Sequence, residues 1–394
     1  MIEAKEIISR INLCIGENRK KDVYIHEPYF RESKAYEYLK ECIDSGWVSS
    51  SGKWVSKFEN LLAEFTGSKY AIVVSNGTVA LRLALFLVGV RANNEVLIPP
   101  LSFVATANSI SHLGGTPHFV DIESESLGMC PKALDKRLNE IGEIRGEEVF
   151  NKLTGAKIAA VVPVHVFGLP AKIQEIKRIC LKWKLKLVED SAEALGSRII
   201  NQNTNIHCGC FGEIGTLSFN GNKIITTGGG GALLTDNEEL AQLAKHLSTT
   251  AKVPHSWDFY HDQVGWNDRL PNINSALGCS QLEEINLKIE KKRILHAKFK
   301  EFFRDINQVE IINESEKCFS NYWLITMRLL GENIEQFRND ILTEAHKSKI
   351  FLRPSWILLN KLPMYREAIS GDLSEANYQS KRLINLPSSP QLIK

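Results

Sequence analysis

Short, mostly apolar runs alternate with amphipathic stretches along the first two-thirds of the chain. The runs are bounded by polar or glycine-containing segments, which is typical of short buried strands. They predict strands at 71–74, 95–98, 116–120, 159–162, 186–188 and 216–218. Apolar spacing near 3.6 predicts helices between them at 78–90, 104–113, 131–139, 171–184 and 237–248. Such alternation favours an α/β fold with a mostly parallel sheet covered by helices on both faces.

The two ends of the chain have a different pattern. Residues 1–30 are a polar lead with a short helical pattern at 7–15, and amphipathic helices are predicted at 33–45 and 55–66. A long amphipathic helix at 282–306 precedes a strand at 321–330 and a helix at 333–347. We therefore expect three parts: a lead at 1–30, a large domain at 31–255, and at 256–394 the long helix with a smaller α+β domain.

Composition narrows the range of function classes. A chain of 394 residues is long enough for two core-forming domains. A net charge of +2 provides no general attraction for nucleic acid, so no nucleic-acid partner is expected. A hydrophobic content of 43% and a charged content of 24% fit a globular protein, and no apolar run reaches the ~20 residues of a spanning helix. We expect no membrane partner.

The eight cysteines are scattered without the rhythm of a disulfide framework. The sequence shows no signal peptide, so reduced thiols and a cytoplasmic location are expected. The segment His207-Cys208-Gly209-Cys210 has metal-binding residue types, but zinc normally takes a second ligand pair at a fuller spacing and none is evident. No metal is expected.

Candidate chemistry centres on Lys223, which is followed after four residues by the glycine run 228–231. A lysine amine can form a Schiff base with a cofactor aldehyde and shuttle protons. Asp190 follows a predicted strand, and an aspartate beside a pyridine nitrogen keeps that ring protonated. Gly77 lies where another strand turns into a helix, whose free N–H groups suit a phosphate. Each signal alone also fits an ordinary surface charge, helix cap or turn, but together they indicate pyridoxal phosphate chemistry.

With these motifs in view, the chain resembles the DegT/DnrJ/EryC1/StrS group of sugar aminotransferases, over roughly residues 25 to 390. The resemblance implies fold type I of the pyridoxal phosphate enzymes, the aspartate aminotransferase-like architecture. The matching stretches are Phe58-Glu59 with Gly67 and Tyr70, Ser75 to Leu81, Pro99 to Asn108, Pro163 to Gly168, Glu189 to Ala194, Ser218 to Lys223, and Gly265 to Arg269.

The resemblance also implies roles for individual residues. Lys223 would bond the cofactor and move the proton, and Asp190 would pair with the pyridine nitrogen. Phe103 would stack on the cofactor face, and Glu193 would line its ring. The phosphate would be held by a set of small and polar residues that includes one from the neighbouring subunit of a homodimer: Gly77, Thr78, Ser218 and the partner's Asn267. His165 is a candidate for the cofactor's hydroxyl side or a buried structural histidine, and Arg353 and Trp356 are candidates for the substrate cleft or for a surface ion pair and a core aromatic.

Two departures from the commonest family pattern concern the subgroup. Asn220 stands where many relatives have histidine, and Gly229 stands where many have glutamate. The form around Lys223, the stretch Gly46 to Lys53 and the insertion at 139–157 look like the legionaminic-type branch. That branch aminates nucleotide-linked 4-keto-6-deoxy hexoses. The resemblance thus implies transfer of an amine from glutamate to C4 of such a sugar, UDP-linked and N-acetylated, for surface polysaccharide or nonulosonic acid biosynthesis.

Four alternatives stay open. A sugar dehydratase of the same family would lack the lysine, so Lys223 argues against it. A 3-aminotransferase would differ in the carbon that is attacked. A nicotinamide-dependent oxidoreductase would need Gly-x-Gly-x-x-Gly after its first strand, whereas the glycines at 228–231 follow Lys223. A non-catalytic regulator would bind pyridoxal phosphate without turnover.

Overall fold

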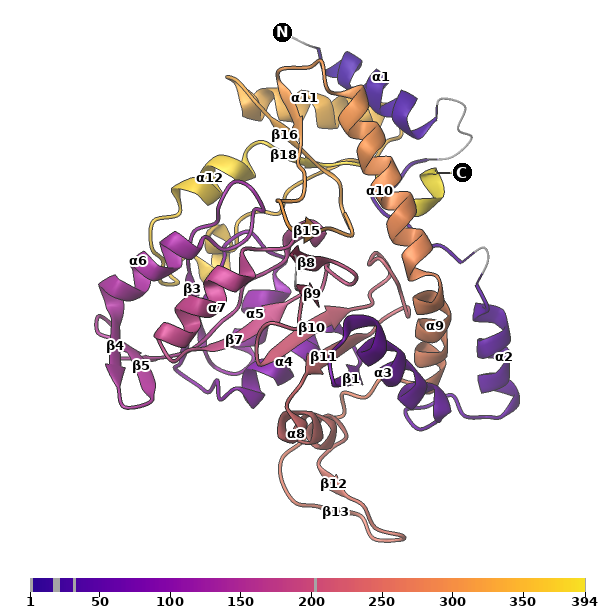
Figure 1. The fold of residues 1–394 in the computed structure, drawn as a ribbon, viewed down its shortest axis with the longest axis vertical. Coiled ribbons are helices and arrows are strands. Elements are labelled where there is room, and N and C mark those ends of the chain that lie inside the picture. Colours follow the sequence, from indigo (N-terminus) through magenta and orange to yellow (C-terminus); the bar gives the residue numbers. More distant parts are fainter. Residues whose placement is uncertain (1–2, 17–21, 31–32, 202–203, 394) are drawn as a thin grey trace.

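The computed structural model describes residues 3–16, 22–30, 33–201 and 204–393. Its centre is a sheet in which β1, β11, β10, β7, β6, β2 and β3 lie side by side in that order (Figure 1). The bounds of these strands are β1 Tyr70–Val74, β2 Glu95–Ile98, β3 Thr116–Phe119, β6 Lys157–Val161, β7 Lys186–Asp190, β10 Ile214–Ser218 and β11 Gly231–Thr235. The five strands from β10 to β3 run parallel to one another. The α/β fold with a mostly parallel sheet is therefore confirmed.

Helices cover both faces of this sheet. One face packs against α4 (Gly77–Leu87), α5 (Ala105–Ser111) and α8 (Glu238–Ser248). The helices on the other face are α3 (Lys53–Thr66), α6 (Pro131–Ile141), α7 (Ile173–Lys182) and α9 (Asn272–Glu283). Within β1 the side chains alternate, since Ile72 packs with the first set and Val73 with the second. All predicted strands and helices of this region are present, with bounds shifted by a few residues.

Strand β11 is an element of the central sheet that the apolar pattern did not predict. It pairs antiparallel with both β1 and β10, and the chain between β10 and β11 carries Lys223. The glycine run 228–231 ends in this strand, since Gly231 pairs with Val74 and Ser218. A Cβ on Gly231 would lie 2.6 Å from the carbonyl carbon of Asn76. The glycine therefore permits the close approach of β11 to the turn between β1 and α4.

The C-terminal part forms a second, smaller layer against the first. Its sheet has the order β14-β16-β18-β17, with bounds Val309–Ile311, Thr326–Leu329, Leu383–Asn385 and Arg353–Pro354. It packs with α10 (Ile285–Phe302), α11 (Ile334–Lys347) and α12 (Ser374–Ser380). The predicted long helix begins later than expected, because Glu284 separates α9 from α10. The smaller α+β region itself is confirmed.

The N-terminal helix α1 (Ala4–Ile15) packs its buried face on α10 and α11 of the smaller region. Helix α2 (Ala35–Asp44) packs on α9. The hairpin of β4 (Gly142–Arg145) and β5 (Glu148–Asn151) extends the central sheet, because β5 pairs antiparallel with β6. Two small β-structures complete the fold: the ribbon of β8 (Arg198–Asn201), β9 (Thr204–His207) and β15 (Cys318–Phe319), and the hairpin of β12 (Lys252–Val253) and β13 (Tyr260–His261). The last of these extends away from the body beyond α8 (Figure 1). The domain limits at 31 and 256 stay a prediction.

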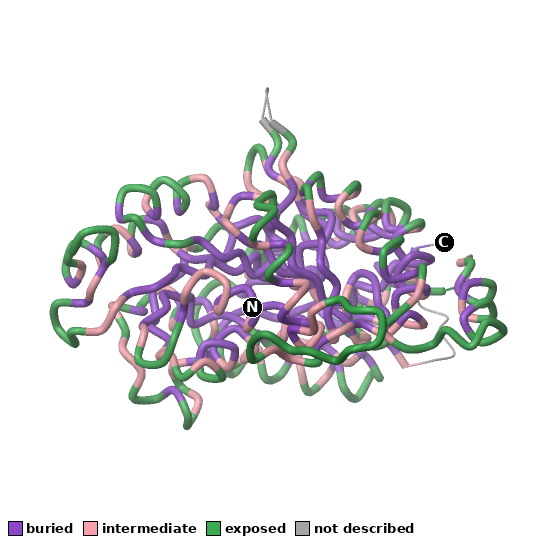
Figure 2. Tube along the Cα trace, turned by 90° about the horizontal axis from the view of Figure 1, so that it is seen from below, coloured by how far each residue is buried: buried purple, intermediate pink, exposed green. Residues whose placement is uncertain are grey.

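Burial follows the layers, because the central strands are almost continuously buried and exposed residues lie on the outer turns of the helices and loops (Figure 2). This is the pattern expected of a sheet covered on both faces. In the described part of the chain, we find no helix that combines the length and the apolar character needed to cross a membrane.

Candidate active site

A cavity of about 680 Å³ lies at the carboxyl ends of β7 and β10 and the start of α4. This is the edge at which open α/β sheets usually bind ligands, and the volume is in the range of ligand pockets. Nine of the predicted site residues line it: Gly77, Thr78, Phe103, Asp190, Glu193, Ser218, Lys223, Arg353 and Trp356. The fold therefore brings together side chains from both sequence regions, 77–223 and 353–356.

The turn from β1 into α4 forms one wall of the cavity. The Asn76 side chain caps α4 by accepting a hydrogen bond of 2.9 Å from the Val79 N–H. A Cβ on Gly77 would lie 2.8 Å from Cβ of Ser218, so only glycine lets these two segments meet. The first N–H groups of α4, the positive end of the helix and the Ser218 hydroxyl thus face one space, which suits a phosphate group.

Asp190 ends β7 on the opposite side of this space. Its carboxylate is 5% exposed, accepts a hydrogen bond of 2.7 Å from the Thr106 hydroxyl and another of 3.2 Å from the Ala192 N–H. Burial raises the pKa of Asp190, and the Thr106 hydrogen bond opposes the increase. A buried carboxylate with so few donors can accept one more from a ligand, such as a protonated ring nitrogen.

Lys223 lies in the loop between β10 and β11. Its Nζ is 3.4 Å from Oε1 of Glu193 and 3.9 Å from the centre of the Trp323 ring. Glu193 in turn accepts a hydrogen bond of 2.7 Å from the Phe167 N–H. Burial raises the pKa of Glu193 to about 7, although the positive charge of Lys223 lowers it in part. The amine thus has a carboxyl neighbour that titrates near neutral pH.

Aromatic and cationic side chains form the outer part of the cavity. Phe103 is 52% exposed, although its neighbour Ser102 is buried, so its ring is free to contact a ligand. The Trp356 ring lies 6.3 Å from the Phe103 ring and 5.0 Å from the Phe167 ring, measured between centroids. Arg353 is exposed at the cavity wall and begins β17.

The structure does not bring His165 and Asn267 into this cavity. His165 is fully buried behind β7, where Nε2 lies 3.1 Å from Glu189 and Nδ1 accepts a hydrogen bond from the Ala171 N–H. It is therefore placed as the structural histidine of the two alternatives. Asn267 is exposed on its own chain, and its side-chain oxygen accepts hydrogen bonds of 3.1 and 3.0 Å from Arg269.

Thr106 and Trp323 are cavity residues that the sequence motifs did not reveal. Thr106 lies in the stretch Pro99 to Asn108 that resembled the family, which is the signal that was available, and its hydroxyl lies 2.7 Å from that of Ser102. Trp323 comes from the smaller region, about 100 residues after the loop that it contacts, and no local pattern marks it.

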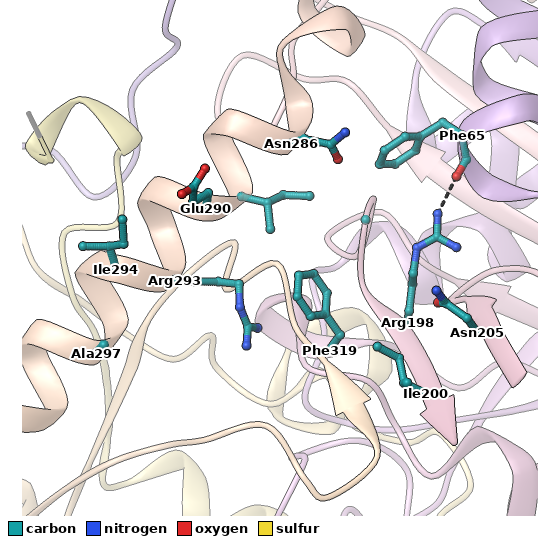
Figure 3. A pocket seen from close by; sticks show the side chains of 12 residues that line it. Phe65, Arg198, Ile200, Asn205, Asn286, Glu290, Arg293, Ile294, Ala297 and Phe319 are labelled. Atoms are coloured by element: carbon teal, nitrogen blue, oxygen red, sulfur yellow. Dashed lines mark hydrogen bonds between the residues drawn. The ribbon is translucent and has the colours of Figure 1, made fainter. Parts of the chain in front are cut away.

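A second cavity of about 640 Å³ lies between α10 and the β8–β9–β15 ribbon (Figure 3). Its two arginines already have partners, since Arg198 donates to the Phe65 carbonyl at 2.5 Å and Arg293 pairs with Glu314 at 2.7 Å. None of the predicted site residues lines it. Among the residues that the structure describes, no group of three or more His, Cys, Asp or Glu side chains is arranged to hold a metal ion.

Comparisons with known proteins agree with this geometry. The model of the DegT/DnrJ/EryC1/StrS aminotransferase family matches residues 31–394. The chain is 34% identical to GDP-perosamine synthase of Escherichia coli O157:H7, with 94% of each chain covered. The structure of Helicobacter pylori PseC, an aminotransferase involved in the biosynthesis of pseudoaminic acid, matches with a TM-score of 0.82 at 27% identity, over 93% of this chain and 94% of that chain.

The fold is also that of the PLP form of Spr1654, a putative sugar aminotransferase from Streptococcus pneumoniae, with a TM-score of 0.81 at 21% identity over 93% of this chain and 94% of that chain. Fold and family together define a pyridoxal phosphate-dependent aminotransferase of fold type I. The chain belongs to the DegT/DnrJ/EryC1/StrS aminotransferase family. The predicted family, fold type, cofactor and enzyme class are thereby confirmed.

Proposed function

We propose that this enzyme transfers an amine from glutamate to C4 of a nucleotide-linked 4-keto-6-deoxy hexose. The observation that carries the proposal is the single cavity that joins Lys223, Asp190 and the start of α4. An amine, a buried acid and an anion site at these positions are what a transaminase needs around pyridoxal phosphate. When bound, that cofactor supplies an electron sink for the carbon that loses or gains a proton.

We assign the roles within the cavity from the geometry of each group. Gly77, Thr78 and Ser218 would hold the cofactor phosphate at the positive end of α4. Asp190 would accept a hydrogen bond from the protonated ring nitrogen, while Thr106 keeps the carboxylate in place. Phe103 would contact the ring.

Lys223 would hold the cofactor when it is bound, and its Nζ is the atom of this chain placed to take up and release protons in the cavity. Glu193, with its pKa raised to about 7 by burial, is the group beside Nζ that can hold a proton when Lys223 gives one up. Proton transfer therefore stays inside a water-poor part of the cavity.

The substrate enters over Phe103, because that side of the cavity carries the exposed residues. Arg353 and Trp356 offer a guanidinium for an anionic group and an aromatic face for a sugar or base. The expected UDP linkage and N-acetyl group stay predictions. The curated relative is named for a GDP-linked product and PseC for pseudoaminic acid biosynthesis, which supports a nucleotide sugar without favouring UDP.

A second copy of the chain completes the site in this proposal. Asn267 is exposed and does not line the cavity of its own chain, so a role at the phosphate requires that it reach the cavity of a partner in a homodimer. The nearby β12–β13 hairpin extends from the body and exposes Trp257 and Phe259, as expected of a surface that another protein covers.

The test is a visible absorption spectrum of the purified enzyme with pyridoxal phosphate, before and after addition of glutamate. We expect the visible band of the lysine-bound cofactor to move into the near ultraviolet with glutamate. It should return when the correct UDP-, GDP- or dTDP-linked 4-keto sugar is added. A band that ignores glutamate would contradict the donor, and absence of any band would contradict the role of Lys223. Return of the band with 3-keto sugars alone would favour the 3-aminotransferase alternative.

A further inference from the structure

The segment that follows β15 reaches the active-site cavity and contributes Trp323 to its wall. Its residues Ser320 to Trp323 are all buried, and Asn321 is fully so. Asn321 and Trp323 each contact one of the two loops that carry catalytic groups, although these loops are more than 100 residues earlier in the chain. The segment therefore links two parts of the site that are not linked directly by sequence.

Trp323 contacts the loop that carries Lys223 in two ways. Its indole N–H donates a hydrogen bond of 2.7 Å to the carbonyl oxygen of Asn222, the residue before the lysine. Its ring face lies beneath Nζ of Lys223, 3.9 Å from the ring centre, which is the geometry of a cation–π contact. The backbone of Trp323 is held as well, because Lys292 Nζ donates to its carbonyl oxygen at 3.0 Å.

Asn321 contacts the loop that follows β7. Its Nδ2 donates hydrogen bonds of 2.9 Å to the carbonyl oxygens of Glu193 and Leu195. Its Oδ1 accepts a hydrogen bond of 2.7 Å from the backbone N–H of Trp323, so the Asn321 side chain is fixed relative to the Trp323 backbone. Gly168, with a φ of +90°, leaves room for this amide, because a Cβ there would lie 2.0 Å from Oδ1.

We propose that Asn321 and Trp323 are positioning residues that hold Nζ of Lys223 against the carboxyl group of Glu193. We name this pair the Asn321–Trp323 clasp. The Asn321 side chain fixes the loop of the carboxyl group, and the Trp323 indole fixes the loop of the amine. The hydrogen bond from the Trp323 backbone N–H to Asn321 Oδ1 holds the two residues together. The clasp rests on the proposed function of Lys223 and extends it, because it makes the reactivity of the amine depend on a segment outside the cofactor-binding domain.

The test compares two ligands of the cofactor-free enzyme. Pyridoxal phosphate must bond Nζ to develop its visible band, whereas pyridoxamine phosphate fills the same space without a bond to Lys223. Trp323→Phe removes the indole N–H but keeps an aromatic face. We expect the band to form about tenfold more slowly, as for loss of one buried hydrogen bond that orients the amine, while the dissociation constant of pyridoxamine phosphate, from equilibrium dialysis, changes less than about twofold.

Trp54→Phe is the matched control. Trp54 is 4% exposed and lies in α3, and its indole nitrogen has no hydrogen-bond partner among the described residues. We expect this variant to match the wild type with both ligands. Asn321→Ser tests the clasp independently of Trp323. It removes the hydrogen-bond donors to the Glu193 and Leu195 carbonyl oxygens, and Asn321 itself does not line the cavity. We expect the same selective slowing of band formation.

Each outcome decides between alternatives. Equal weakening of both ligands by Trp323→Phe and Asn321→Ser would overturn the clasp and leave the two residues as supports of the general fold. Unchanged band formation would overturn it as well. If the wild type itself forms no band, the proposed function fails and the role of the clasp fails with it, a result that is distinct because it does not depend on any substitution.

Discussion

Glu189 and Asp190 are adjacent in β7, yet their carboxylates have different surroundings. Glu189 accepts hydrogen bonds from the N–H groups of Gly209, Phe211 and Gly212 at 2.9, 2.6 and 2.8 Å and is fully buried. His165 completes this Glu189 cluster: since its Nδ1 accepts from Ala171, Nε2 carries the proton and donates to Glu189.

Asp190 faces the cavity, with one hydroxyl and one N–H as donors. The difference shows how this fold separates support from chemistry. Along a strand, alternate side chains point to opposite faces, so one residue can be saturated by the protein while the next retains capacity for a ligand. The Glu189 cluster should govern stability and the cavity should govern activity, and the following substitutions test that separation.

The largest effect is expected from Lys223→Ala. Loss of the amine removes both the bond to the cofactor and the proton carrier, so turnover should fall by a factor on the order of 10⁴ or more. Thermal unfolding of the cofactor-free variant should match the wild type, because Lys223 makes few contacts that support the fold. Turnover close to the wild-type rate would contradict the central assignment.

Asp190→Asn should lower kcat/KM by a factor on the order of 10³, because a neutral amide stabilises a protonated ring nitrogen much less than a carboxylate does. The free energy of unfolding should be equal or higher, since the buried carboxylate has a raised pKa and an amide is less costly to bury. Steady-state kinetics and urea titration measure the two quantities. A variant that is unstable but active would reverse the assignment of Asp190.

Glu189→Gln should show the opposite behaviour. The carboxylate accepts hydrogen bonds from backbone N–H groups, and the NH2 group of the new amide cannot accept them. The free energy of unfolding should therefore decrease by about 4 kcal/mol. Below the unfolding transition, KM should stay within about twofold of the wild type. A large change in KM at full folding would show that the cluster takes part in substrate binding.

Glu193 provides a pH test in the cofactor-free enzyme. Its pKa in the folded chain is raised to about 7 by burial, so the folded chain keeps this proton longer than the unfolded chain does. The corresponding stability is present below about pH 4.5 and is lost as pH rises to about 7, a difference of about 3 kcal/mol. Glu193→Gln should remove this slope in urea titrations between pH 5 and pH 8. An unchanged slope would contradict the raised pKa.

The smallest effect is expected from Asn267→Ala, which should weaken pyridoxal phosphate binding about tenfold, the equivalent of one hydrogen bond to a charged group. The substitution leaves the cavity of its own chain unchanged, because Asn267 is exposed and does not line that cavity. Mixing this variant with Lys223→Ala protein gives mixed dimers in which one site contains both Lys223 and the partner's Asn267. Cofactor affinity at that site is a direct check of the shared site. Unchanged cofactor affinity in the dimer would show that each chain holds its phosphate alone.

How much of this site the sequence could predict depends on where the contacts come from. Gly77, Asp190 and Ser218 each stand at a strand end beside a characteristic turn or helix, so local patterns were sufficient. Strand β11 was missed because its start, Gly231, reads as part of a flexible glycine run, whereas its role depends on a close approach to Asn76.

The more distant contacts had no local signal. Trp323 and Asn321 act on loops at 193–195 and 222–223, and only the packing of the smaller region on the sheet brings them there. His165 lay in a stretch similar to the family, but the direction of its ring depends on the hydrogen bonds of the Glu189 cluster. Contacts between distant segments were therefore the part that residue patterns left undetermined.

The indole beneath Lys223 has a practical consequence. Trp323 is one of seven tryptophans, and its ring centre is 3.9 Å from Nζ of Lys223, the atom that we propose bonds the cofactor. An excited indole in contact with a chromophore that absorbs in the visible range loses its energy to that chromophore. Tryptophan fluorescence should therefore decrease as the site fills with cofactor, so cofactor occupancy can be followed without any added label.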